Sequence, residues 1–182
     1  MAFDPSLLGL CGALRAGSTN RLLLAEARAA FGPCTYAEGN LRLPLFDEDL
    51  EIAEGIPAAV QKLADQIKAA DAIVIACPEY NKSLPGVLKN ALDWISRTKG
   101  APWRDKPLAI VSAAEGRAGG ERAQYALRLC LNPFQARVLA GPEVMIAHSR
   151  TAFDADGHLI DSKSSAGLAD LMGALRTLAA GK

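Results

Sequence analysis

The stretch Ala76–Cys–Pro–Glu–Tyr–Asn–Lys–Ser–Leu–Pro–Gly86 separates two segments with different periodicity. The apolar run 71–76 before it is typical of a strand buried on both faces of a parallel sheet. In the segment 85–97 after it, apolar residues recur with helical spacing, and Pro85 suits the first turn of a helix. Residues 78–84 are therefore predicted to form a loop at the carboxyl end of a strand, where open α/β sheets bind ligands.

The same alternation continues along the chain. We predict strands at residues 7–11, 35–37, 71–77 and 107–112, and a broken last strand at 138–139 and 144–147. We predict helices at residues 19–31, 57–70, 85–97, 121–131 and 165–178, with loops at 12–20 and 41–50 and a turn at 154–157. Strands that alternate with helices form parallel units. The predicted fold class is α/β: a doubly wound five-stranded parallel sheet in the order 2-1-3-4-5, with helices on both faces.

Length and composition favour one cytoplasmic domain spanning residues 1–182. The chain carries 20 basic and 20 acidic residues, so neither a nucleic-acid partner nor a membrane-surface partner is expected. No apolar run approaches the roughly 20 residues that span a bilayer, and the N-terminus lacks the basic start and long apolar region of a secretion signal. The cysteines follow no metal-ligand spacing, so we expect no metal site and four reduced, buried thiols: Cys11, Cys34, Cys77 and Cys130.

The loop 12–20 is rich in glycine and leads into a predicted helix, an arrangement that favours a bound phosphate group. The dinucleotide fingerprint is absent, and Ser18 stands where an ATP-binding P-loop requires lysine. A tyrosine-phosphatase loop is also excluded, because its arginine would fall on Gly17. Arg15, Ser18 and Asn20 can converge on one terminal phosphate. The loop alone leaves a second interpretation open, in which Ser18 only caps the helix and Arg15 is solvated.

Longer motifs carry a resemblance to a known family. The segments Gly12–Ala–Leu–Arg–Ala–Gly–Ser–Thr–Asn20 and Pro78–Glu–Tyr–Asn–Lys–Ser–Leu–Pro–Gly–Val–Leu–Lys–Asn–Ala–Leu–Asp–Trp–Ile–Ser–Arg97 resemble the NADPH-dependent FMN reductase family. That family is flavodoxin-like and includes quinone, azo and chromate reductases. The segment Gly116–Arg–Ala–Gly–Gly–Glu–Arg–Ala–Gln124 is similar to the family's third flavin-side loop. The resemblance extends over nearly the whole chain and implies a flavodoxin-like fold that binds FMN.

The resemblance also implies roles for residues in all three loops. Three residues of the first loop match the positions that hold the FMN phosphate: Arg15, Ser18 and Asn20. Four residues of the second loop match positions along the edge of the isoalloxazine ring, which they bond largely through backbone groups: Pro78, Glu79, Tyr80 and Asn81. Two residues precede or form the loop near the pyrimidine side of the ring: Ser112 and Gly116.

Three functions remain open at this point. The resemblance favours an enzyme in which NAD(P)H passes hydride to N5 of FMN and the electrons then pass to a small acceptor, such as a quinone, an azo compound, chromate or free flavin. FMN carries this chemistry, so no catalytic side chain is assigned. The alternatives are a flavodoxin-like one-electron carrier and a module that has lost FMN. The last is motivated by Ala13, Ala113 and Ala114, which stand where the family commonly has hydroxyl residues.

Trp94 lies at the edge of the apolar stripe of the helix predicted at 85–97. A partly exposed tryptophan there indicates a partner surface, whereas one covered by the following loop through Trp103 is part of the core. The sequence leaves both interpretations open. Because members of the family are typically dimers or tetramers, we expect a homodimer or homotetramer with this helix in or beside the interface.

The second loop contains no glycine. In one-electron carriers of the flavodoxin type, a glycine beside N5 allows a peptide to flip at little cost. Here Pro78 and Pro85 restrict the two ends of the loop, and Asn81 is its only residue that tolerates the left-handed region. The sequence therefore predicts a stiff loop, which suits hydride transfer better than one-electron transfer.

Overall fold

Residues 4–181 are described in the computed structural model, and residues 1–3 and 182 lie outside the described part. The described residues form a sheet in the order β2-β1-β3-β4-β5, with β6 also paired to β4, and all pairs are parallel. The strands are β1 (Ser6–Cys11), β2 (Thr35–Gly39), β3 (Ala72–Ala76), β4 (Pro107–Ala113), β5 (Arg137–Val138) and β6 (Val144–Ile146). The predicted order 2-1-3-4-5 is confirmed.

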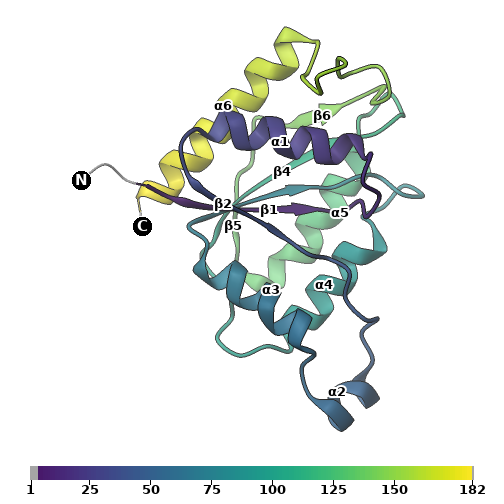
Figure 1. The fold of residues 1–182 in the computed structure, drawn as a ribbon, viewed down its shortest axis with the longest axis vertical. Helices are drawn as coiled ribbons and strands as arrows, with labels where there is room; N and C mark the ends of the chain where they lie inside the picture. The colour runs from purple at the N-terminus through teal and green to yellow at the C-terminus, as the bar shows by residue number, and fades with distance from the viewer. Residues whose placement is uncertain (1–3, 182) are drawn as a thin grey trace.

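Helices cover both faces of the sheet (Figure 1). The α-helices are α1 (Thr19–Phe31), α2 (Glu48–Glu54), α3 (Ala58–Ala69), α4 (Gly86–Ser96), α5 (Glu121–Leu131) and α6 (Ser162–Ala180), and a 3-10 turn, η1, spans Asn132–Phe134. Helices α1 and α6 lie on one face, and α3, α4 and α5 lie on the other. In the part of the chain that the structure describes, no helix is both long and apolar enough to cross a bilayer.

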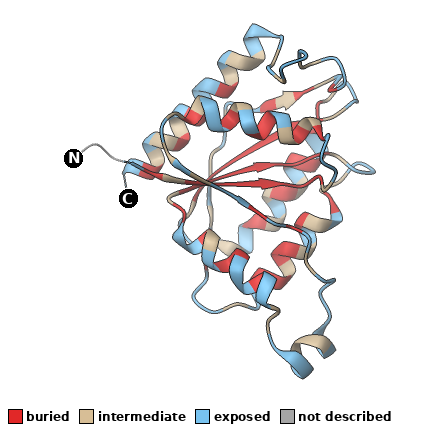
Figure 2. Ribbon diagram, viewed as in Figure 1, coloured by how far each residue is buried: buried red, intermediate tan, exposed pale blue. Residues whose placement is uncertain are grey.

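The core consists of two apolar layers, one on each side of the sheet. Alternate residues of one strand enter different layers, because successive side chains of a strand point to opposite faces. In β3, Ile73 and Ile75 pack toward α3, α4 and α5, whereas Val74 packs toward α1 and α6. The inner strands are accordingly buried along their length (Figure 2). All four cysteines are free thiols, but Cys34 and Cys130 are only partly buried, unlike the buried cysteines that we predicted.

The predicted broken last strand is confirmed. β5 pairs with the start of β4 and β6 pairs with its end, and the chain leaves the ladder between them. β6 thus lies beside the carboxyl end of β4, where the ligand-binding edge of the sheet begins.

In the region around α4, one prediction is wrong and one question that the sequence left open is answered. The segment 41–50 was expected to be a loop throughout, but α2 begins at Glu48, capped by the carboxylate of Asp47. All residues of α2 are at least partly exposed, so the sequence offers no apolar periodicity to reveal it. Trp94 is fully buried, so it does not form an exposed partner surface. The ring of Phe46 packs edge-on against it, with the two ring centroids 5.1 Å apart.

Candidate functional site

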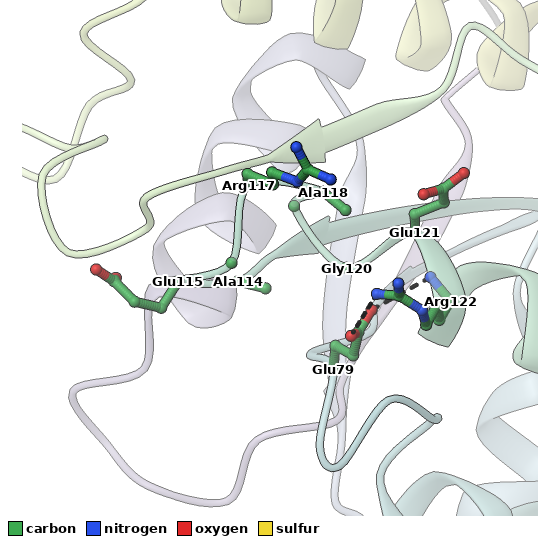
Figure 3. A pocket seen from close by; sticks show the side chains of 10 residues that line it. Glu79, Ala114, Glu115, Arg117, Ala118, Gly120, Glu121 and Arg122 are labelled. Atoms are coloured by element: carbon green, nitrogen blue, oxygen red, sulfur yellow. Dashed lines mark hydrogen bonds and ion pairs between the residues drawn. The ribbon is translucent and has the colours of Figure 1, made fainter.

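Three loops meet at the carboxyl edge of the sheet, where they follow the adjacent strands β1, β3 and β4. We refer to residues 12–18 as the first loop, 77–85 as the second and 114–120 as the third. A cavity of about 630 Å³ lies between Glu79 and the third loop with the start of α5 (Figure 3). A second cavity, of about 500 Å³, lies between the first and second loops. Its lining residues are Gly12, Leu14, Arg15, Leu43, Leu45, Tyr80, Pro85, Gly86, Val87 and Asn90.

The first loop ends at the N-terminus of α1. Ser18 is buried and caps this helix, because its Oγ accepts a hydrogen bond of 3.2 Å from the backbone N–H of Asn20. The cap uses Ser18 Oγ as an acceptor and leaves its hydroxyl proton unused. Arg15 is exposed and lines the second cavity. The helix dipole, the Ser18 hydroxyl and the Arg15 guanidinium therefore offer three sources of positive potential to a phosphate group.

Asn20 lies apart from these groups. Its side-chain amide is buried and bonded to the backbone of β4: Nδ2 donates to the carbonyl oxygen of Ala113 at 2.7 Å, and Oδ1 accepts from the Ala113 N–H at 3.0 Å. The expectation that Asn20 holds the phosphate is therefore not supported by its side-chain contacts, which fasten the end of β4.

The second loop contains a tight two-residue turn. The backbone groups of Tyr80 and Ser83 exchange two hydrogen bonds of 3.1 Å each, and the residues between them, Asn81 and Lys82, have φ angles of 50° and 66°. Positive φ at both central residues defines a type I′ turn, which is unusual without glycine. Pro78 is buried, and a Cβ added to Gly12 would lie 2.9 Å from its ring. The two cross-turn hydrogen bonds are consistent with the stiff loop that the sequence predicts.

Glu79 projects from the second loop toward α5 (Figure 3). Its carboxylate accepts a hydrogen bond of 3.2 Å from the backbone N–H of Arg122 and lies 3.7 Å from the Arg122 guanidinium. Cys77 precedes this region in the core, where burial raises the pKa of its thiol far above the ordinary value. The Cys77 thiol is therefore protonated at neutral pH and does not act as a nucleophile.

A buried polar network supports the third loop. Ser112 Oγ donates a hydrogen bond of 2.6 Å to the carbonyl oxygen of Gly119 and accepts one of 2.9 Å from Gln124 Nε2. Ser112 and Gln124 are fully buried, so the Ser112 hydroxyl acts on the loop and is not presented to a ligand. Gly119 adopts a φ of 60°, and a Cβ there would lie 2.5 Å from the backbone of Met145 in β6. These contacts fix the return of the loop toward α5.

Gly116, another glycine of the third loop, lies in open space, unlike the crowded Gly119. A Cβ added to Gly116 would meet no heavy atom of residues 4–181 within 4 Å, so the loop is open on the side of the cavity. Open glycine backbone allows a planar ligand to approach closely. Together with the anion-binding end of α1, this arrangement fits a mononucleotide with a flat ring, which is the shape and charge of FMN.

Sequence reasoning assigned no role to Arg122 or Gln124, which orient Glu79 and Ser112. Both lie in the motif Gly116–Gln124, which was identified as a whole. The motif therefore indicated that this segment belongs to the site, but it does not predict which of its side chains face inward.

The 2-1-3-4-5 parallel sheet defines the flavodoxin-like class of folds, whose FMN-binding members hold the flavin at the switch point between β1 and β3. The chain belongs to the NADPH-dependent FMN reductase family, whose pattern matches residues 5–151.

Relatives and solved structures agree with this assignment. The NAD(P)H-dependent FMN reductase of Pseudomonas aeruginosa is 46% identical over 166 residues, which cover 90% of this chain and 89% of that protein. The quinone reductase of Escherichia coli is 43% identical over 140 residues, covering 75% of this chain and 74% of that enzyme. Among solved structures, the flavoenzyme NAD(P)H:(acceptor) oxidoreductase FerB of Paracoccus denitrificans superimposes with a TM-score of 0.87 at 30% identity, covering 97% of this chain and 98% of that one.

Proposed function

We propose that this chain is a cytoplasmic FMN-dependent NAD(P)H oxidoreductase that delivers electrons to a small acceptor of the quinone type. The observation that carries the proposal is the meeting of an anion-binding helix N-terminus, a rigid type I′ turn and an open glycine loop on three adjacent strands. Relatives named quinone reductase and FMN reductase support the class of reaction. Residues 1–182 constitute one FMN-binding domain in this proposal.

We assign the residues of the site as follows. Arg15 and Ser18 hold the phosphate, and backbone groups of Pro78, Glu79, Tyr80 and Asn81 lie along the edge of the ring. Gly116 gives the ring access to the third loop. Asn20 and Ser112 support the loops from behind, because their side chains are buried and bonded to protein backbone.

When bound, FMN supplies the redox chemistry, because its ring accepts hydride at N5 and returns two electrons. The chain contributes position and exclusion of water. The Tyr80–Ser83 turn holds the ring-side backbone in one conformation, and Leu14, Leu43 and Val87 line the neighbouring cavity with apolar surface. A flat apolar acceptor such as a quinone suits this cavity, with Tyr80 at its edge.

The geometry of the turn favours the enzyme over a one-electron carrier. Flipping the central peptide of a type I′ turn gives a type II′ turn, whose first central position is dominated by glycine. That position is Asn81, and both hydrogen bonds between Tyr80 and Ser83 hold the present form. The second loop thus resists the peptide flip on which flavodoxin-type carriers depend.

We also propose a homo-oligomer whose interface includes α2 and the loop before it. Helix α2 projects from the body of the molecule (Figure 1), and Ile52 and Leu45 are 78% and 80% exposed. Leu45 also lines the second cavity, so a second copy seated here would wall the acceptor site. Exposed apolar side chains on a projecting element are typical of a subunit interface.

The test is the spectrum and turnover of the purified protein. We expect about one non-covalent FMN per chain, oxidation of NAD(P)H when a quinone is supplied, and bleaching of the flavin in one two-electron step. Protein that takes up no FMN would refute the proposal. Protein that binds FMN but leaves NAD(P)H unoxidised would favour the carrier.

A further inference from the structure

Asn20 occupies an unusual position between two loops of the site. It is the second residue of α1 and lies two residues after Ser18, the cap of this helix at the end of the first loop. Its side chain, however, points away from that loop and is 2% exposed. Both ends of the carboxamide bond to Ala113, the last residue of β4. One side chain therefore joins the first loop to the start of the third.

The backbone of Ala113 requires such a partner. β3 pairs with β4 only as far as Ala76 and Val111, after which the Cys77 N–H bonds to Val111 and the chain turns into the second loop. β4 continues for two residues beyond Val111, and the side of Ala113 that would face β3 has no strand beside it. The carboxamide of Asn20 supplies one donor and one acceptor there, as a peptide group of a neighbouring strand would.

The third loop starts immediately after this contact. The Ala114 N–H bonds to Ile146 of β6, and the loop then runs to Gly119, where Ser112 holds it. The start of the loop is thus fixed from one side by β6 and from the other by Asn20. Since both Asn20 and Ala113 are 2% exposed, water cannot replace the lost bonds without disturbing the loop.

We propose that Asn20 is a positioning residue that couples the first loop to the third and makes no direct contact with the phosphate. The inference rests on the proposed binding of FMN. The proposal predicts different effects for Asn20 and Arg15. A residue that orders the third loop affects the binding of every flavin, whereas a residue that contacts the phosphate affects the binding of FMN only. Asn20 therefore sets the shape of the ring site from a position behind the phosphate site.

The first experiment compares Asn20→Ala with Arg15→Ala by fluorescence titration of FMN and riboflavin. We expect Asn20→Ala to weaken both flavins by a similar factor, about 10-fold, and Arg15→Ala to weaken FMN alone. Amide hydrogen exchange in flavin-free protein should show faster exchange at residues 113–119 in Asn20→Ala and no change there in Arg15→Ala. Loss of FMN binding by Asn20→Ala with unchanged riboflavin binding and exchange would identify a phosphate ligand and overturn the proposal.

The second experiment uses Asn20→Asp, which is nearly the same size. A protonated carboxyl can donate to the Ala113 carbonyl and accept from its N–H, whereas an ionised carboxyl can only accept. Burial raises the pKa of the introduced carboxyl, so riboflavin affinity and exchange protection should recover as the pH falls from about 8 to about 5. The wild type should show no such recovery. A variant that stays equally impaired at both pH values would contradict the role of the two bonds.

A third measurement uses the wild-type protein and therefore does not depend on whether a variant folds. Resonances of the Asn20 side-chain amide should shift when riboflavin binds, although riboflavin carries no phosphate. An unchanged Asn20 amide in the riboflavin complex would overturn the coupling. Wild-type protein that binds neither flavin would show that the proposed function is wrong. The role of Asn20 is tested separately, because amide exchange is measured in flavin-free protein.

Discussion

The indole Nε1 of Trp94 donates a hydrogen bond of 2.8 Å to the carbonyl oxygen of Pro44 and so fastens the middle of α4 to the segment that leads into α2. Asn90, one turn earlier on α4, bonds to the same carbonyl and also accepts from the Phe46 N–H. Arg97 pairs with Glu51 of α2 at 2.8 Å. Trp94 therefore anchors this projecting segment to α4 from the buried side, and the most exposed large apolar side chains of the segment are Leu45 and Ile52.

The first prediction concerns the oligomer. The double variant Leu45→Glu/Ile52→Glu should dissociate it, because both side chains are largely exposed and would bring charge into the proposed interface. Ile160→Glu, at an equally apolar exposed position before α6, should leave assembly unchanged. Sedimentation velocity measures the outcome. Wild-type protein that sediments only as a 19.1 kDa species would contradict the proposed oligomer.

The second prediction tests the phosphate site. Arg15→Ala should weaken FMN binding by about 10-fold or more, since a charge-assisted hydrogen bond contributes ~1.5–3 kcal/mol. Arg104→Ala removes an exposed arginine on a segment distant from the three loops and should have no effect on affinity. Isothermal titration of both variants with FMN gives the comparison. Equal losses in the two variants would show a general effect of charge.

The third prediction separates two glycines of the third loop. Gly119→Ala should destabilise the fold by several kcal/mol, because its Cβ would overlap the Met145 backbone at 2.5 Å and its φ is 60°. Gly116→Ala, where the Cβ points into open space, should keep wild-type stability and weaken only flavin binding. Urea unfolding of the flavin-free proteins measures the difference. Similar midpoints for the two variants would mean that the Met145 backbone of β6 shifts at little cost to accommodate the added Cβ.

The fourth prediction concerns the strain of the type I′ turn. Lys82 has a φ of 66°, a conformation that costs a residue with a side chain ~1 kcal/mol relative to glycine. Lys82→Gly should therefore raise the thermal midpoint by a few degrees, roughly 2–4 °C. Lys82→Ala removes the same charge without relieving the backbone and should give no gain. A higher midpoint in both variants would implicate the charge instead.

The fifth prediction is a pH dependence at the contact between α1 and the segment before α6. Glu26 bonds to His158 at 3.0 Å and raises the pKa of the imidazole above its ordinary value of 6.5. The protonated form is therefore stabilised by folding, and its contribution is complete below pH 6.5 and is lost as the pH rises through the higher folded pKa. The difference in thermal midpoint between wild type and His158→Gln should shrink from about pH 5 to about pH 9.

Glu26→Gln is the matched control for that experiment. It keeps an acceptor for the imidazole and removes the charge that contributes most to the raised pKa of His158. The midpoint difference between His158 and His158→Gln in this background should therefore depend less on pH, with the remaining dependence due to Asp154 and Asp156. If the midpoint difference between wild type and His158→Gln grew as the pH rose, the predicted direction of the pH dependence would be wrong.

The sequence predicted the parts of the fold that depend on burial. Ala72–Ala76 and Pro107–Ala113 are continuous apolar strands, and the helices that cover them have one apolar face, so both the alternation and the strand order followed. Helix α2 could not be found in this way, because none of its residues is buried and its ion pair with Arg97, at the end of α4, is remote in sequence. The cover of Trp94 by Pro44 and Phe46 is equally non-local.

The site was predictable as three loops but not as a set of contacts. The motifs placed Arg15, Ser18 and Gly116 in loops at the carboxyl edge of the sheet, where the structure has them. They could not show that Asn20 and Ser112 face the interior, since that depends on where β3 ends relative to β4. Lys82 was not expected at positive φ, because lysine has no intrinsic preference for that region and the hairpin bonds of Tyr80 and Ser83 impose it.

The interrupted last strand also has a consequence for how this sheet can diversify. β5 stays in register with Pro107 and Leu108, and β6 stays in register with Val111, Ser112 and Ala113, while residues 140–143 between them lie outside both ladders. Insertions or deletions in this excursion would change the length of the chain without shifting either register. Lineages that lengthen it could add a wall beside the ligand edge while the strands that hold the third loop keep their places.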